Sequence, residues 1–265
     1  LHKRTCDLDS AVTHYIDLSS VNLIISALDK ISPDIFINCA GYTDVEACEA
    51  FPDMAFLVNS DIAKNIAVAC QLVGVKLVHI STDHLFDGNS SFYTEDDPPR
   101  PVNIYGLSKA IGEEYVLSIC PDTLVLRTNF FGWGQIYRRS FSDFIIDNLR
   151  TSCQISLYTD VFFTPVSIPV LVQTVLFLIR SKASGIYNIP CRQRVSKYEF
   201  GIILAETLLL DPELISPVRY SSTEHSVSRP LDMSLSGSKI SLLLPSSLVD
   251  TADQIRLMSE RVELF

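Results

Sequence analysis

Two residues spaced one helical turn apart, Tyr105 and Lys109, form the pair in this sequence that is best suited to proton transfer. Residues four positions apart in a helix lie on the same face, so the phenol and the ammonium of a Y-x-x-x-K segment are neighbours. A lysine charge beside a phenol favours the phenolate, and this makes the tyrosine a suitable proton donor to a carbonyl oxygen. The pattern alone is common, and a solvated helix face is the alternative interpretation.

A hydroxyl group at the end of an apolar segment supplies a second chemical signal. The segment KLVHIS at 76–81 is typical of a strand buried on both faces, and Thr82 follows it directly. In open α/β sheets, ligands bind beyond the carboxyl ends of the strands. We therefore expect Thr82, Tyr105 and Lys109 to form one catalytic group suited to carbonyl reduction. The alternative is that the hydroxyl only caps a loop.

The elements that must position these residues alternate between buried strands and amphipathic helices. Strand-type apolar runs occupy 34–40, 76–81, 123–128 and 185–189. Helical periodicity covers 21–31, 52–73, 103–119, 167–181 and 196–210. This alternation predicts an α/β fold with a Rossmann-like, doubly wound parallel sheet.

The alternation becomes less regular after about residue 150. We expect a dinucleotide-binding domain over 1–150, with 165–182 returning to it. Residues 183–265 are then expected to form mainly a smaller α+β substrate domain.

Composition restricts the class of protein. Of the 265 residues, 47% are hydrophobic and 20% are charged, which excludes intrinsic disorder. The net charge of -10 argues against nucleic acid or an anionic membrane as a general partner. The sequence has no signal-peptide pattern and no apolar run near 18 residues, and its seven cysteines lack metal-ligand spacing. We expect a cytoplasmic protein with free thiols and no metal, and the oligomeric state is open, with a homodimer as one candidate.

Nine segments, taken in order along the chain, resemble the extended short-chain dehydrogenase/reductases, and within them the dTDP-4-dehydrorhamnose reductase branch. The resemblance is carried by PDIFINCAGYTDVEACE at 33–49, VN at 58–59, HISTDHLFDG at 79–88, YTEDD at 93–97, PVNIYGLSK at 101–109, GE at 112–113, RTNFFG at 127–132, GIYNI at 185–189 and RPLDMSL at 229–235. The ordered set is far more specific than any single motif.

The resemblance implies a nicotinamide cofactor, NADPH or NADH, and a nucleotide-activated 4-keto-6-deoxyhexose as substrate. Hydride would pass to C4 of the sugar while Tyr105 protonates the oxygen, Lys109 also binds the nicotinamide ribose, and Thr82 holds the carbonyl or the phenol. The residues implied to contact the cofactor are Asp17, Leu18, Gly41, Tyr42, Thr43, Tyr105 and Lys109, and those expected at the substrate are Val45, Thr82, Asp83, His84, Phe130 and Arg229.

Three positions leave alternatives open. Phe130 stands where the family often has a tryptophan that stacks on the sugar, and His84 stands where it usually has tyrosine, so the sugar's identity is open. Each could also be structural, Phe130 as a core aromatic and His84 as a solvated loop residue. Arg229 suits a substrate pyrophosphate, and a structural salt bridge is its alternative.

The start of the chain departs from the family. The sequence contains neither G-x-G-x-x-G nor G-x-x-x-x-G-K-[ST], whereas the family places a strand, a glycine-rich turn and a helix before the segment at Asp17. Residues upstream of Leu1 are therefore expected to carry most of the pyrophosphate cradle. Arg4 would follow the second strand, where a basic residue can pair with a 2′-phosphate and so favours NADPH. A solvated terminal charge is the alternative.

Two other functions remain as alternatives. One is a dehydratase or epimerase acting on a nucleotide sugar. Dehydratases that resemble this family have the segment T-D-E after the strand, and His84 takes the place of its glutamate here, so the carboxylate for elimination is missing. The other is a non-catalytic binding relative, such as the regulatory subunit of methionine adenosyltransferase. The presence of Thr82, Tyr105 and Lys109 argues against lost catalysis.

Overall fold

The computed structural model describes residues 12–134, 139–220, 227–244 and 248–260 of the chain. Arg4, which the sequence assigns to the cofactor phosphate, lies outside the described residues.

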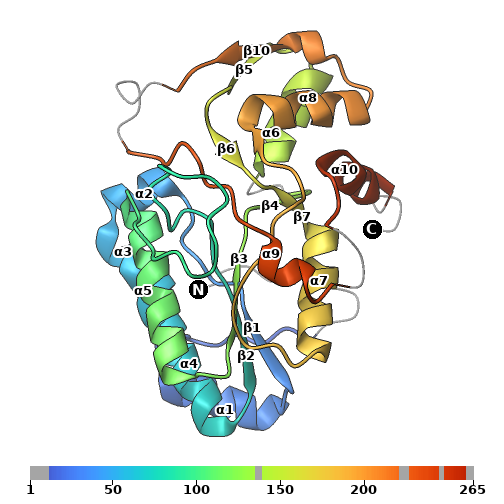
Figure 1. The fold of residues 1–265 in the computed structure, drawn as a ribbon. Coiled ribbons are helices and arrows are strands. Elements are labelled where there is room, and N and C mark those ends of the chain that lie inside the picture. Colours follow the sequence, from blue (N-terminus) through green and yellow to red (C-terminus); the bar gives the residue numbers. More distant parts are fainter. Residues whose placement is uncertain (1–11, 135–138, 221–226, 245–247, 261–265) are drawn as a thin grey trace.

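A four-stranded parallel sheet forms the centre of the molecule (Figure 1). Its order is β1-β2-β3-β8, and every neighbouring pair is parallel. The strands are β1 (Ile35–Asn38), β2 (Lys76–Ile80), β3 (Leu124–Arg127) and β8 (Gly185–Asn188). The carboxyl ends of all four strands therefore meet at one edge, and the α/β fold expected from the sequence is confirmed.

Helices cover both faces of this sheet, as its apolar alternation requires. Leu77 and Val125 pack toward one face, and their neighbours Val78 and Leu124 pack toward the other. The first face carries α1 (Val21–Ile31), α4 (Ile62–Val73) and α5 (Ile104–Ile119), and the second carries α7 (Ile168–Arg180) and α9 (Ser238–Ser241) (Figure 1).

The helical pattern over 52–73 contains an irregular turn that periodicity does not predict. The structure divides it into α3 (Pro52–Phe56), a π-helical turn η1 (Leu57–Asp61) and α4. Such turns insert one residue into a helix and occur frequently at functional sites. The turn buries Asn59, whose side chain faces the loop that follows β1.

A second hydrophobic core lies beyond the carboxyl edge of the sheet. Phe131, Ile145, Phe200 and Ile255 are among its buried members. Its elements are β4 (Phe130–Phe131), α6 (Phe141–Arg150), β5 (Ile155–Tyr158), β6 (Phe162–Phe163), β9 (Val195–Ser196), α8 (Lys197–Thr207), η2 (Pro212–Leu214), β10 (Ile215–Val218) and α10 (Thr251–Glu260). β10 pairs with β5 in parallel, β9 pairs with β6 antiparallel, and β4 pairs with β7 (Val166–Ser167) in parallel.

This second core draws on both sides of the expected boundary at residue 150. Helix α6 lies before that boundary, yet Ile145 and Leu149 pack in the same cluster as Phe200 of α8. The division into domains stays a prediction, and the cluster shows which side chains share a core.

One short helix that the sequence did not indicate lies next to the site. Asp44 caps α2 (Val45–Ala50) by accepting a hydrogen bond from the Ala47 amide at 2.9 Å. Six residues are too few for a helical period to be recognised. Among the helices of the described ranges, none is both long and apolar enough to cross a membrane.

Candidate active site

The first turn of α5 carries Tyr105. Asn103 caps this helix, because its side-chain oxygen accepts a hydrogen bond from the Gly106 amide at 2.9 Å. A Cβ at Gly106 would clash with the backbone carbonyl of His84, so glycine allows the helix to approach the loop after β2 closely. The ring of Tyr105 is 8% exposed and meets the His84 ring edge-on, with 5.4 Å between the ring centroids.

Lys109 lies one turn further along α5 and is buried. Its ammonium group donates a hydrogen bond to the backbone carbonyl of Ile80, at the last residue of β2, with a distance of 2.7 Å. Burial lowers the pKa of Lys109 to about 8, while the nearby Glu113 carboxylate raises it. The lysine is therefore charged at neutral pH, and its position is tied to the strand that ends at Thr82.

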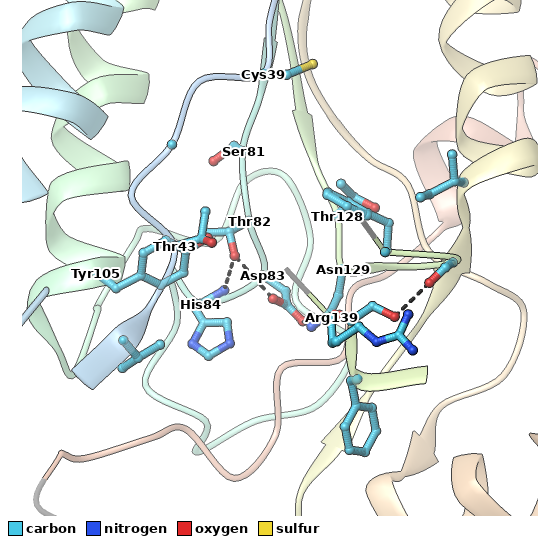
Figure 2. A pocket seen from close by; sticks show the side chains of 18 of the residues that line it. Cys39, Thr43, Ser81, Thr82, Asp83, His84, Tyr105, Thr128, Asn129 and Arg139 are labelled. Atoms are coloured by element: carbon cyan, nitrogen blue, oxygen red, sulfur yellow. Dashed lines mark hydrogen bonds between the residues drawn. The ribbon is translucent and has the colours of Figure 1, made fainter. Parts of the chain in front are cut away.

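The loop after β2 contributes three polar side chains to the site. Ser81, Thr82 and Asp83 are all buried and line the same cavity as Tyr105 (Figure 2). The Thr82 hydroxyl accepts a hydrogen bond from the His84 amide at 3.3 Å and donates a long one to Asp83 at 3.4 Å. Asp83 also accepts a hydrogen bond of 2.7 Å from the side-chain amide of Asn129. The carboxyl ends of β2 and β3 are thus joined across the sheet edge.

The loop after β1 forms the neighbouring wall. The Asn59 side chain accepts a hydrogen bond from the Tyr42 amide at 2.8 Å and donates one to the Tyr42 carbonyl at 3.0 Å. It also donates to the Ser108 hydroxyl at 2.9 Å. The π-helical turn therefore fixes the Gly41–Thr43 backbone against α5, which carries Tyr105.

These walls enclose a cavity of about 590 Å³ at the carboxyl edge of the sheet. It is lined by Cys39, Gly41, Thr43, Val45, Ser81, Thr82, Asp83, His84, Tyr105, Thr128, Asn129, Phe130, Gly132, Trp133, Gly134, Arg139, Ser140, Phe141 and Ile168 (Figure 2). A cavity of this size suits a small organic ligand. One wall comes from the ends of β1 to β3, and the other comes from β4, residues 132–134 and 139–140, and the start of α6.

Eight of the residues that the sequence assigns to the site lie in this lining. They are Gly41, Thr43, Val45, Thr82, Asp83, His84, Tyr105 and Phe130. Phe130 is 51% exposed at β4, so its ring is available to a ligand. His84 has a pKa lowered to about 3, first by burial and then by the charges of Lys197 and Arg229, and its imidazole is neutral at physiological pH.

The remaining assigned residues lie outside the lining. Lys109 is buried behind the lining, where it donates to the Ile80 carbonyl, and the backbone of Tyr42 is hydrogen-bonded to the Asn59 side chain. Asp17 and Leu18 precede α1, where the Leu18 carbonyl accepts a hydrogen bond from Asn65 of α4 at 3.3 Å. Arg229 forms an ion pair with Glu46 of α2, which is the salt bridge named above as its alternative.

Several cavity residues were not found from the sequence. They include Asn129, Trp133, Arg139 and Phe141, all contributed by the segment after β3. The sequence signal in this part of the chain is the RTNFFG segment, which predicts Phe130 as a substrate contact. Arg139 precedes α6 and forms an ion pair with Asp147 of that helix at 2.6 Å, and this link across eight residues has no sequence signature of its own.

The comparisons with known proteins agree with this geometry. The family model described as "RmlD substrate binding domain" matches residues 2–263. A probable low-salt glycan biosynthesis reductase from Haloferax volcanii is 32% identical over 222 residues, which are 82% of this chain and 74% of that protein. A dTDP-4-keto-6-deoxy-D-glucose reductase from Streptomyces niveus is 30% identical over 212 residues, which are 77% of this chain and 71% of that protein.

Among solved structures, the fold is similar to that of a dTDP-4-dehydrorhamnose reductase from Bacillus anthracis in complex with NADP. The TM-score is 0.86 at 27% identity, and the match covers 93% of this chain and 87% of that one. A dTDP-glucose 4,6-dehydratase from Streptomyces venezuelae, at 21% identity, is similar in fold alone. The chain thus belongs to the RmlD substrate-binding domain family, in the dTDP-4-dehydrorhamnose reductase branch of the extended short-chain dehydrogenase/reductases.

Proposed function

We propose that this protein is an NAD(P)H-dependent reductase of the 4-keto group of a nucleotide-activated 6-deoxyhexose, acting in polysaccharide biosynthesis. The observation that carries the proposal is the shared cavity of Tyr105 and Thr82, with the charged Lys109 buried beneath them. A sugar nucleotide is the small-molecule partner, and the compartment is a reducing cytoplasm, in which the described cysteines are free thiols.

The described residues fit a nicotinamide cofactor at the β1 and β2 side of the cavity. The Ser81 hydroxyl is buried in the lining and has no hydrogen-bond partner among the described residues, so a polar group of a ligand is expected there. A Cβ at Gly41 would lie 3.1 Å from the Thr43 side chain, so the backbone is close-packed at this point. Gly41–Thr43, Tyr105 and Lys109 would hold the nicotinamide end, and Asp17 and Leu18 the adenine. When bound, the cofactor supplies the hydride.

The chain's own residues then manage the proton and the substrate. Tyr105 gives its hydroxyl proton to the sugar O4 as the alcohol forms, and Lys109 supports the resulting phenolate. Thr82 orients the same oxygen by a hydrogen bond. Phe130 stacks on the apolar face of the sugar and, together with the other aromatic side chains of that wall, limits the access of water.

Reduction is favoured over dehydration by the side chain at position 84. A dehydratase needs a carboxylic acid or carboxylate to remove a proton beside the carbonyl, and His84 is a neutral imidazole at neutral pH. It also packs edge-on against Tyr105, where it adds no second acid.

The experiment that tests this function measures cofactor oxidation by the full-length protein. NADPH and NADH are each supplied with a panel of nucleotide-activated 4-keto-6-deoxyhexoses, and the corresponding 4-hydroxy sugars serve as matched controls. We expect oxidation only with the 4-keto compounds. If no 4-keto sugar nucleotide is turned over, the reductase assignment is wrong and a binding role takes its place.

The pH dependence of this reaction follows from Lys109. Its charged form exists below about pH 8, so kcat/KM, which reports the free enzyme, should fall as the pH rises through about 8. This fall of kcat/KM at alkaline pH, the alkaline limb of the profile, should disappear in Lys109→Arg, because the guanidinium stays charged. The activity of that variant should be lower overall. Lys197 also has its pKa lowered to about 8 by burial, so Lys197→Arg is the matched control and should retain the limb. A limb that disappears only in Lys197→Arg would contradict the role of Lys109.

A further inference from the structure

A second lysine, Lys197, stands close to the cavity on an element that carries none of the residues discussed so far as catalytic. It is the first residue of α8, and a capping box between Ser196 and Glu199 fixes the start of that helix. β9, which ends at Ser196, pairs with β6, and the Lys197 amide donates to the Val161 carbonyl at 2.9 Å. The backbone of Lys197 is therefore fixed in place by the helix cap and by its hydrogen bond to Val161.

The side chain of Lys197 is held by aromatic rings. Its ammonium nitrogen lies 3.3 Å from the centroid of the Phe163 ring and 4.9 Å from that of Phe141. Phe141 also lines the cavity, which places the lysine charge directly behind this part of the cavity wall. Aromatic faces attract a cation without neutralising it. No carboxylate of the described residues lies within 4.0 Å of this nitrogen, so its charge acts on its surroundings at longer range.

Asp83 is an acidic group that lines the same cavity as Phe141, the ring against which the Lys197 ammonium lies. Asp83 is 1% exposed, lines the cavity, and accepts side-chain hydrogen bonds from Asn129 at 2.7 Å and from Thr82 at 3.4 Å. A carboxylate has about four acceptor positions, so Asp83 has capacity for a ligand hydroxyl. A carboxyl group this deeply buried favours its neutral form unless a nearby positive charge opposes the cost of burial.

We propose that Lys197 is a positioning residue that keeps Asp83 ionised, so that the carboxylate accepts a hydrogen bond from a hydroxyl group of the sugar. The proposal rests on the proposed function for the identity of the ligand, but the electrostatic link between the two residues does not. Lys197 acts from the second core on a residue at the end of β2, and so connects substrate recognition to both parts of the fold.

The balance of charges around Asp83 is consistent with this role. Burial raises the pKa of Asp83 to about 6, whereas the Asn129 hydrogen bond, the Lys197 charge and the Thr82 hydroxyl lower it. The same carboxylate raises the pKa of Lys197, which burial lowers to about 8. Both groups are therefore charged at neutral pH.

The other groups that face this pair do not replace Lys197. His84 is neutral because burial lowers its pKa to about 3. Arg229 lowers the pKa of His84 and of Lys197 through its charge, and its own ion pair is with Glu46 and not with Asp83. Without the Lys197 charge, Asp83 would take up a proton close to neutral pH and one of its oxygens would become a donor.

The experiment observes Asp83 directly, in full-length protein without substrate. The carboxyl carbon is labelled, its resonance is assigned with Asp83→Asn, and it is titrated by nuclear magnetic resonance in the wild type, Lys197→Met and Lys197→Arg. Methionine keeps the apolar stem over Phe163 and removes the charge, and arginine keeps the charge. We expect a midpoint near pH 6 in the wild type. We expect a rise of roughly one unit or more in Lys197→Met, and a midpoint close to that of the wild type in Lys197→Arg.

A kinetic measurement then tests the link to the substrate. At pH 7, Lys197→Met should raise KM for the 4-keto sugar nucleotide by roughly twofold if the Asp83 midpoint rises by about one unit, and by roughly tenfold if it rises by about two units. The change in kcat should be much smaller, because the protonated fraction of Asp83 loses only its hydrogen bond to the bound sugar. The difference should close at pH values well above the shifted midpoint. Equal midpoints in the wild type and Lys197→Met would overturn the proposal, and so would a Lys197→Arg midpoint that equals that of Lys197→Met. If no sugar is turned over, the proposed function fails, and the titration still decides the Lys197–Asp83 link.

Discussion

Replacement of Tyr105 by phenylalanine is expected to lower kcat for the 4-keto sugar nucleotide by roughly 10²- to 10⁴-fold, because the variant lacks the proton that O4 requires. The substitution removes one oxygen atom and keeps the ring. That ring packs in a small buried cluster with Val45, Cys48 and Ala55 and meets His84 edge-on. Stability should therefore change little, and the loss should appear mainly in kcat.

The matched control for this variant lies on the same helix. Tyr115 of α5 is stacked beneath the ammonium of Lys64, 5.1 Å from the ring centroid, and lies outside the cavity lining. Tyr115→Phe should keep the activity of the wild type. Steady-state kinetics and cofactor titration by nicotinamide fluorescence measure both variants. A Tyr105→Phe enzyme that retains most of its kcat would show that the proton comes from another group.

Replacement of Arg127 by methionine should reduce the free energy of unfolding by roughly 3–5 kcal/mol, because it leaves the Glu113 carboxylate buried without its partner. The guanidinium of Arg127 donates two hydrogen bonds of 3.2 Å and one of 2.9 Å to Glu113. The two side chains are 2% and 4% exposed, so solvent does not screen the pair. The loss should be visible as a lower midpoint in denaturant unfolding.

The double variant Arg127→Met/Glu113→Leu separates a lost charge pair from lost packing. Removal of both charges from a buried site is often close to neutral, so most of the lost stability should return. Glu113 also raises the pKa of Lys109, so the alkaline limb of kcat/KM should move to lower pH in the double variant. If the double variant is as unstable as Arg127→Met, packing rather than charge is the larger contribution of Arg127.

Those parts of the fold and site that depend on local pattern could be predicted from the sequence. The strand ending before Ser81 is marked by its apolar run, and the spacing of Tyr105 and Lys109 places both on one helix face whatever the surroundings. Thr82 follows because ligands of open α/β sheets bind where strands end. Each of these inferences needs only a few neighbouring residues.

The rest of the site depends on packing between distant segments. Asn129 reaches Asp83 across 46 residues, and Arg229 reaches Glu46 across 183 residues. In neither pair does one residue belong to a motif that predicts the other. The position of the Lys197 charge likewise depends on the packing of α8 beside Phe163. The π-helical turn at Asn59 was also missed, because an inserted residue breaks the helical period only slightly.

The two hydrophobic cores on either side of the cavity have a consequence for how new specificities evolve. The proton donor Tyr105 is carried by α5, which packs on one face of the sheet. Phe131 and the other apolar side chains behind the opposite cavity wall belong to the second core. Mutations can accumulate in that second core and reshape the space around the sugar while the proton-transfer residues keep their support. Substitutions that change which sugar is accepted can thus be made in this chain without moving the residues that carry out the proton transfer.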